Sequence, residues 1–357
     1  MGTTASSRRS AGLDLLRLLA ACGIIMIHVL GQGGALYTDN PTAELVPWFF
    51  GALSYGAVDC FALISGYVGQ GRRVRFASLA SLELQTLLYS VGITAVLQLL
   101  SHGRIWLGFR DVFPTLTLRY WYFSAYTALF CLTPFLNRAL ASLERRPLLL
   151  CSLGLVLVLS LADTTSSRDP FALEGGFCTL WLLALYLLGG FLGRFRPLDR
   201  LPGWALCLIW LFTLVLGWLI RYFHVEPLEA LAAGYTSPFT VLGACCLIAL
   251  FSRLRLRRCG GTITWLAGSS FALYVIHAHP RFSSWLLAGS LSGILTLSSP
   301  EQVGRILLRV GLVAGVCLLI DLPRRLIWRL LRVPERLSRL EERLRGRFIR
   351  EEVTSGE

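Results

Sequence analysis

The chain has 357 residues, of which 55% are apolar and only 15% are charged. Because soluble proteins usually contain about 25% charged residues, this composition excludes an ordinary water-soluble protein and indicates a lipid environment. The formal net charge of +13 does not indicate nucleic-acid binding, because the arginines follow the pattern of membrane topology. No nucleic-acid partner is therefore expected.

The apolar residues form long runs, and a run of roughly 17–25 mostly apolar residues can cross a bilayer as a helix. We therefore predict an all-α fold, a polytopic membrane helix bundle with about ten transmembrane helices. Pro280 is a point at which the ninth span can kink or break. In chain order, the predicted spans are Leu13–Leu30, Trp48–Val68, Leu79–Leu100, Tyr120–Leu136, Leu148–Leu161, Phe177–Leu192, Trp204–Tyr222, Phe239–Phe251, Ile263–Ala288 and Val303–Ile320.

The arginines orient these spans. If the N-terminus is inside and the spans alternate, most arginines fall in inside segments, as the positive-inside rule requires. We predict a multi-pass protein of the cell membrane with both termini in the cytoplasm. The inside segments between spans contain Arg72, Arg73 and Arg75; Arg138, Arg145 and Arg146; Arg194, Arg196 and Arg200; and Arg253, Arg255, Arg257 and Arg258.

Three segments are expected along the chain: a cytoplasmic N-terminus (1–10), a transmembrane domain (11–322) and a cytoplasmic tail (323–357). In the tail, Leu and Ile recur at three- and four-residue spacing among Arg and Glu. This pattern predicts a basic amphipathic C-terminal helix that lies on the membrane face and is attracted by anionic lipid. The ten cysteines fit neither a zinc site nor a disulfide framework, and no metal site is expected.

Ionisable residues inside spans are informative, because burying them in a membrane is costly. The first span contains Asp14, Arg17 and His28. Eleven residues differ from three helical turns by only about 20°, so Arg17 and His28 share one helix face, about 16 Å apart along the axis. Asp14 lies on the same face. The alternatives are that Arg17 extends to lipid phosphates and that His28 is a hydrogen-bonded packing residue.

Later spans add further candidates. Asp59 lies in the middle of the second span, where it can hydrogen-bond an imidazole on a neighbouring helix or pair with an unrelated donor. Ser65, followed by a glycine, permits close helix approach. Trp121 and Tyr122 open the fourth span and also suit an interfacial aromatic belt. His277, in the ninth span, is predicted at a depth similar to that of His28, where the two histidines can share a cavity.

These residues carry a family resemblance. The segment GLDLLRLLAACGIIMIH resembles the opening motif of the acyltransferase type 3 family of bacterial membrane acyltransferases, an arginine, ten residues and a histidine, here Arg17 and His28. The segments VDCFALISGYV, YWYFSAYTALFCLTPFLN and FALYVIHAHP resemble the family's second-span motif and two later motifs of its surface-polysaccharide O-acetyltransferase branch. The resemblance runs in order from about residue 11 to residue 320.

The resemblance implies an enzyme that moves an acyl group, usually acetyl, from cytoplasmic acyl-CoA to a hydroxyl of a cell-surface glycan or lipid-linked precursor. Acyl-CoA is then a co-substrate, and no permanently bound cofactor is expected. Arg17 would face the donor, helped by Arg72, Arg73 or Arg75, and His28 would act as general base or form a transient acyl-histidine, with Asp59 setting its tautomer. Asp14, Ser65, Trp121, Tyr122 and His277 would line the substrate or support these groups.

Two other functions fit parts of the pattern. A transporter or flippase for a polar or lipid-linked solute also places Asp, Arg and His inside the membrane, but the chain has no evident internal repeat of the kind common in transporters. A sensory or scaffold protein could use the basic tail to recruit a partner. The ordered motifs favour the acyltransferase over both.

Overall fold

The computed structural model describes residues 10–38, 44–166, 168–225 and 228–355, and these form helices and turns with no β-strand. The all-α prediction is therefore confirmed for this part of the chain, whereas the predicted N-terminal segment 1–10 lies almost wholly outside it. The helices are α1 (Ala11–Gln32), α2 (Leu45–Gly69), α3 (Phe76–Leu100), α4 (Phe109–Val112), α5 (Trp121–Ser142), α6 (Arg145–Thr165), α7 (Thr179–Phe195), α8 (Gly203–Tyr222), α9 (Leu228–Ala232), α10 (Pro238–Arg253), α11 (Gly260–Ala267), α12 (Ser270–His277), α13 (Pro280–Leu287), α14 (Ser299–Leu330) and α15 (Val333–Ser355).

Six of the described helices are long and apolar enough to cross a membrane: α1, α2, α3, α6, α8 and α14. The predicted sixth and eighth spans form the shorter apolar helices α7 and α10, and α5 is a 22-residue helix that contains Pro134. The ninth apolar run is divided among α11, α12 and α13. The chain is thus a helical membrane protein, but the count of about ten transmembrane helices is not confirmed.

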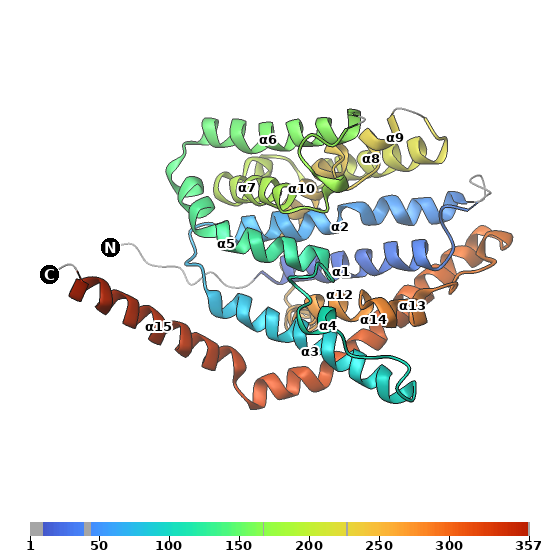
Figure 1. Ribbon diagram of the computed structural model, residues 1–357. Helices are drawn as coiled ribbons and strands as arrows, with labels where there is room; N and C mark the ends of the chain where they lie inside the picture. The colour runs from blue at the N-terminus through green and yellow to red at the C-terminus, as the bar shows by residue number, and fades with distance from the viewer. Residues whose placement is uncertain (1–9, 39–43, 167, 226–227, 356–357) are drawn as a thin grey trace.

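Helix α2 lies in the middle of the bundle, between α1 on one side and α7 and α10 on the other (Figure 1). Glycines allow its close packing against α7. A Cβ atom added at Gly66 would lie 1.9 Å from the backbone oxygen of Tyr186, and one added at Gly189 would lie 2.1 Å from that of Leu63. Such close backbone approach is the usual role of small residues between membrane helices, and it agrees with the role expected at Ser65 and Gly66.

One end of the bundle collects the arginine-rich segments. We call it the basic end; it holds the N-terminus of α1, the loop between α2 and α3, and the C-termini of α5, α10 and α14, and it lies to the left in Figure 1. Contacts tie these segments together: Asn137 donates to the backbone oxygen of Gly69 (3.4 Å), and Arg325 donates to Ser269 (2.9 Å).

The tenth predicted span, Val303–Ile320, lies within α14, a helix that runs past the predicted end of the span. Pro323 lies inside α14, which continues to Leu330. A buried ion pair one turn long spans this proline: Arg324 donates to both carboxylate oxygens of Asp321 (2.6 and 3.0 Å), and Tyr89 of α3 donates to the same group (2.5 Å). These bonds hold the helical turn that a proline would otherwise weaken. The chain bends instead at Arg332, whose φ is 49°.

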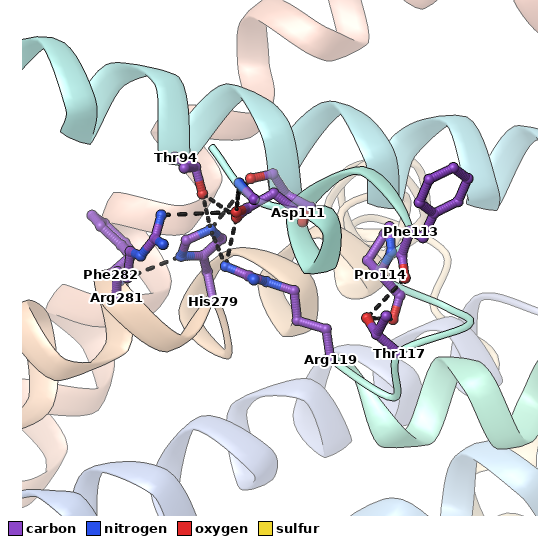
Figure 2. A network of polar contacts seen from close by, with 11 residues as sticks. Thr94, Asp111, Phe113, Pro114, Thr117, Arg119, His279, Arg281 and Phe282 are labelled. Carbon is purple, nitrogen blue, oxygen red and sulfur yellow. Dashed lines mark hydrogen bonds and ion pairs between the residues drawn. The ribbon is translucent and has the colours of Figure 1, made fainter. Parts of the chain in front are cut away.

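The break between α12 and α13 is held by a polar cluster from three other segments (Figure 2). His279, which lies in the break, accepts from the backbone N–H of Phe282 and so caps α13. Its Nε2 lies 3.1 Å from the hydroxyl of Thr94 on α3, which donates to Asp111 of α4 (2.5 Å). Arg119 pairs with the same carboxylate (2.9 Å). The cluster therefore holds the chain at the point where α12 ends, after His277, and α13 begins, at Pro280.

Asp111, in the short helix α4, is buried. Burial raises its pKa, but hydrogen bonds from Thr94 and Gly108 and the charges of Arg119 and Arg281 outweigh this, so its pKa is below the usual value. Asp111→Asn leaves the Arg119 guanidinium, 8% exposed, without its carboxylate, which should cost about 3–5 kcal/mol of stability. Thermal unfolding of the detergent-solubilised protein measures this loss.

The matched control is Asp199→Asn, since Asp199 is 37% exposed in its ion pair with Arg196 and should change stability by about 1 kcal/mol or less. The stability that ionised Asp111 contributes is complete above the unfolded pKa of about 3.9 and is lost as the pH falls through the lower folded value. The unfolding temperature of the wild type should thus fall more steeply below pH 4 than that of Asp111→Asn. Equal slopes, or equal losses in both variants, would contradict this role.

Candidate functional site

Asp14, Arg17 and His28 all lie on one unbroken helix, α1. It is a continuous helix of 22 residues whose N-cap, Ser10, accepts from the backbone N–H of Leu13. Arg17 donates to the buried carboxylate of Asp14 (2.7 Å), so these two residues share a face as predicted. The unbroken helix also keeps Arg17 and His28 on one face, about 16 Å apart along the axis, with Arg17 toward the basic end.

His28 contacts a second histidine from the broken ninth run. The Nδ1 atom of His28 lies 2.9 Å from Nε2 of His277, and their ring centroids are 4.9 Å apart. His277 is fully buried at the C-terminal end of α12, and its Nδ1 lies 2.5 Å from the backbone oxygen of Leu273, one turn earlier in the same helix. The structure thus brings together two side chains that are 249 residues apart.

These contacts assign the ring protons of the neutral pair. A carbonyl oxygen only accepts, so Nδ1 of His277 must carry a proton and donate it to Leu273. Nε2 of His277 is then an acceptor, and Nδ1 of His28 must carry the proton between the rings. The remaining nitrogen, Nε2 of His28, is left with a lone pair. The arrangement prepares His28 to accept a proton, in the way that an oriented histidine does in hydrolase triads.

An aromatic helix face leads from this pair toward the basic end. On α5, Tyr122, Tyr126 and Phe130 follow one another at four-residue spacing, with ring centroids 6.3 and 6.2 Å apart. Tyr274 of α12 joins this row to the histidines, since its ring lies 6.1 Å from Tyr122 and 6.4 Å from His277. Tyr122 therefore lines the interior of the bundle and does not belong to an interfacial belt.

Trp121 lies at the edge of this row. Its ring packs against Phe177, with centroids 4.6 Å apart, and its edge meets Tyr122, with centroids 5.6 Å apart. Ser65 donates to the backbone oxygen of Phe61 (2.8 Å), which satisfies its hydroxyl within α2.

Asp59 does not have the partner that was expected. Its Oδ1 accepts from the indole N–H of Trp181 on α7 (3.2 Å), and its Oδ2 has no hydrogen-bond partner among the described residues. The expected contact with the His28 imidazole is taken by His277. His277, and not Asp59, therefore lies beside Nδ1 of His28, and Asp59 instead joins α2 to α7.

The three arginines after α2 lie at the basic end, but in two environments. Arg72 and Arg73 line a cavity of about 750 Å³, together with Arg138 of α5 and Arg345 of α15. Arg75 instead donates to Ser338 of α15 (2.8 Å). The sequence analysis did not single out Arg138 or Arg345. For Arg138 a signal was available, because Tyr122, Tyr126, Phe130 and Pro134 precede it at four-residue spacing on one face of α5.

Within the described residues, no group of three or more His, Cys, Asp or Glu side chains is arranged to hold a metal ion. The polar groups that the bundle does bring together are the paired imidazoles, the arginines at the basic end and the tyrosines between them.

Comparisons with known proteins identify the family of the chain. Searches of curated proteins and of solved structures found no significant match. A family model described as an acyltransferase domain, that of the acyltransferase type 3 family, matches residues 10–323. This range covers most of the chain and includes α1 to α13 and most of α14. The chain therefore belongs to the acyltransferase type 3 family of membrane acyltransferases.

Proposed function

We propose that this protein transfers an acyl group, most simply acetyl, from acyl-CoA to a hydroxyl of a cell-surface glycan or lipid-linked precursor. The observation that carries the proposal is the hydrogen bond between His28 and His277, which gives one imidazole an oriented lone pair deep in the bundle. Family membership supports acyl transfer in general. The donor, the acceptor and the acetyl group are the proposed part.

The donor enters from the basic end. The nucleotide of acyl-CoA is strongly anionic, and guanidinium groups bind phosphate through charge-assisted hydrogen bonds. Arg17, which lies on the same face of α1 as His28 but nearer the basic end, provides that charge together with Arg72 and Arg73. The nearly uncharged pantetheine arm then runs along the tyrosines of α5 and places the thioester beside His28. By the positive-inside rule this end faces the cytoplasm, with both chain termini on that side.

The chemical step uses the ring protons assigned above. Nε2 of His28 takes the proton of the acceptor hydroxyl as the hydroxyl oxygen attacks the thioester carbonyl carbon. The C–O bond forms, the C–S bond breaks, and the coenzyme A thiolate takes the proton back from His28. His277 accepts the Nδ1–H of His28 throughout, which fixes the ring and stabilises its charged form.

The first test removes the base and keeps its hydrogen bond. In His28→Asn, the side-chain amide can still donate to His277, but the nitrogen that accepts the proton is missing. Transfer of labelled acetyl groups from acetyl-CoA in membranes should fall by about 100-fold or more, with unchanged protein level. His102→Asn, the same change at an exposed histidine, is the control. Near-wild-type transfer by His28→Asn would remove His28 from the reaction.

The second test separates positioning from packing at His277. In His277→Gln, the amide oxygen can accept from His28, whereas His277→Leu offers no acceptor. We expect His277→Leu to lower kcat by about tenfold to 100-fold, with little change in KM for acyl-CoA, and His277→Gln to recover most of the rate. If both variants lose the same activity, His277 has only a packing role.

The third test concerns the donor site. Arg17→Gln removes a positive charge from the face of α1 and should raise the KM for acetyl-CoA by roughly 10- to 100-fold, because hydrogen bonds to charged groups contribute about 1.5–3 kcal/mol. The kcat should change less, since Arg17 lies about 16 Å from His28 along the helix axis. A KM equal to that of the wild type would exclude Arg17 from the donor site.

A further inference from the structure

The cavity at the basic end has walls from three parts of the chain. The loop between α2 and α3 and the start of α3 form one wall, the C-terminal half of α5 forms the second, and α15 forms the third. Its volume of about 750 Å³ lies within the range of small-molecule and cofactor sites. Helix α15 follows the predicted membrane domain and was expected only to lie on the membrane face.

Charge is concentrated in this cavity. Arg72, Arg73, Arg138 and Arg345 line it, with Glu341 as the single acidic side chain among the lining residues. The formal surplus is three positive charges. A cavity of this charge favours a ligand with several negative charges, and the planar guanidinium groups match phosphate oxygens.

The remaining walls are apolar. Phe76 and Pro134 lie on the bundle side, and Leu337, Leu340 and Leu344 lie at successive turns of α15. Inorganic phosphate alone would not use these walls, whereas a nucleotide would, since its base has a flat apolar face and its phosphates are charged. The combination therefore fits a phosphorylated nucleoside.

Specific hydrogen bonds seat α15 on the bundle near the N-terminus of α3 (Figure 1). The carboxylate of Glu341 accepts from the backbone N–H of Ala77 (3.0 Å), Arg345 donates to the backbone oxygen of Val74 (2.9 Å), and Arg75 donates to Ser338 (2.8 Å). Glu341 thus occupies backbone N–H groups at the positive end of α3, which also attract phosphate.

The cavity and the proposed donor path share the helix α5. Pro134, Asn137 and Arg138, which line it, belong to the helix that carries Phe130, Tyr126 and Tyr122 toward the histidines. Asn137 is held in place there, because its side-chain oxygen accepts from the hydroxyl of Tyr186 (2.8 Å).

We propose that this cavity binds the phosphorylated nucleotide end of the donor and that α15 is one of its walls, with Arg345 as a binding residue and Glu341 as a residue that weakens binding. The inference rests on the proposed use of acyl-CoA. It adds a segment beyond residue 323, the end of the matched family domain, to the donor site.

The test is equilibrium binding of coenzyme A and of adenosine 3′,5′-bisphosphate to the purified full-length chain in lipid nanodiscs. Neither probe requires acyl transfer. Arg345→Ala and Arg138→Ala should each raise the Kd by roughly tenfold or more. The matched control is Arg343→Ala, which removes the same charge from an exposed position of α15 outside the cavity, and it should stay within about twofold of the wild type.

Glu341→Gln should change the Kd in the opposite direction from Arg345→Ala and Arg138→Ala. The amide keeps an oxygen that can accept from Ala77, but it removes the negative charge and with it the ion pair that Glu341 makes with Arg345. Arg345 can then bind phosphate without this competitor, so the Kd for both probes should fall by a few fold. If α15 only supports the fold, Glu341→Gln and Arg345→Ala would both weaken binding or both leave it unchanged, and either result would overturn the proposal. Equal weakening by Arg343→Ala and Arg345→Ala would also overturn it, because it would show general charge attraction.

The outcomes for the site and for the proposed function are distinguishable. If the wild type binds coenzyme A and the cavity variants bind it equally well, the α15 site is wrong while the donor remains acyl-CoA. If the wild type binds neither probe, the donor assignment fails and the α15 site fails with it.

Discussion

A polar side chain inside this bundle is stabilised by partners within the protein, because a lipid environment offers no hydrogen bonds and an unsatisfied group there is costly. The hydrogen bond between His28 and His277 follows from this constraint. So do the largely buried pairs of Asp111 with Arg119 and Asp321 with Arg324, and the half-buried pair of Asp14 with Arg17. Each pair joins or stiffens helices at a defined depth.

The histidine pair depends on irregular helices as much as on regular ones. Helix α1 runs unbroken and keeps Arg17 and His28 on one face, whereas the ninth apolar run is divided so that α12 ends at His277. The polar cluster around Asp111 and His279 holds that end (Figure 2). His277 and His279 lie on either side of this helix end, so one short segment contacts both His28 and the cluster around Asp111.

Much of the fold was predictable from the sequence, because a long apolar run indicates a helix whatever its neighbours are. The spans predicted at Leu13–Leu30 and Trp48–Val68 became α1 and α2 with ends shifted by only a few residues. The prediction failed where distant partners decide the outcome. The predicted span Val303–Ile320 stopped short of Leu330, where α14 ends, and a hydrogen bond from Tyr89, 232 residues earlier than Asp321, helps to keep the turn at Pro323 helical.

The candidate site shows the same limit. The spacing of Arg17 and His28 is local, and it is sufficient to place both on one face. The partner of Asp59 is not local: Trp181 is 122 residues away, and the sequence gives no sign of that contact. Likewise, the tail could be recognised as amphipathic, but not as the helix that brings Glu341 and Arg345 to the loop after α2.

The central claim is that His277 acts through His28, and a double-mutant cycle on the rate of acetyl transfer tests it most directly. The rates of His28→Asn, His277→Leu and the double variant are compared with that of the wild type. If His277 only orients and stabilises His28, the double variant should be no slower than His28→Asn alone. If the two losses instead multiply, the histidines act independently, and the paired mechanism is contradicted.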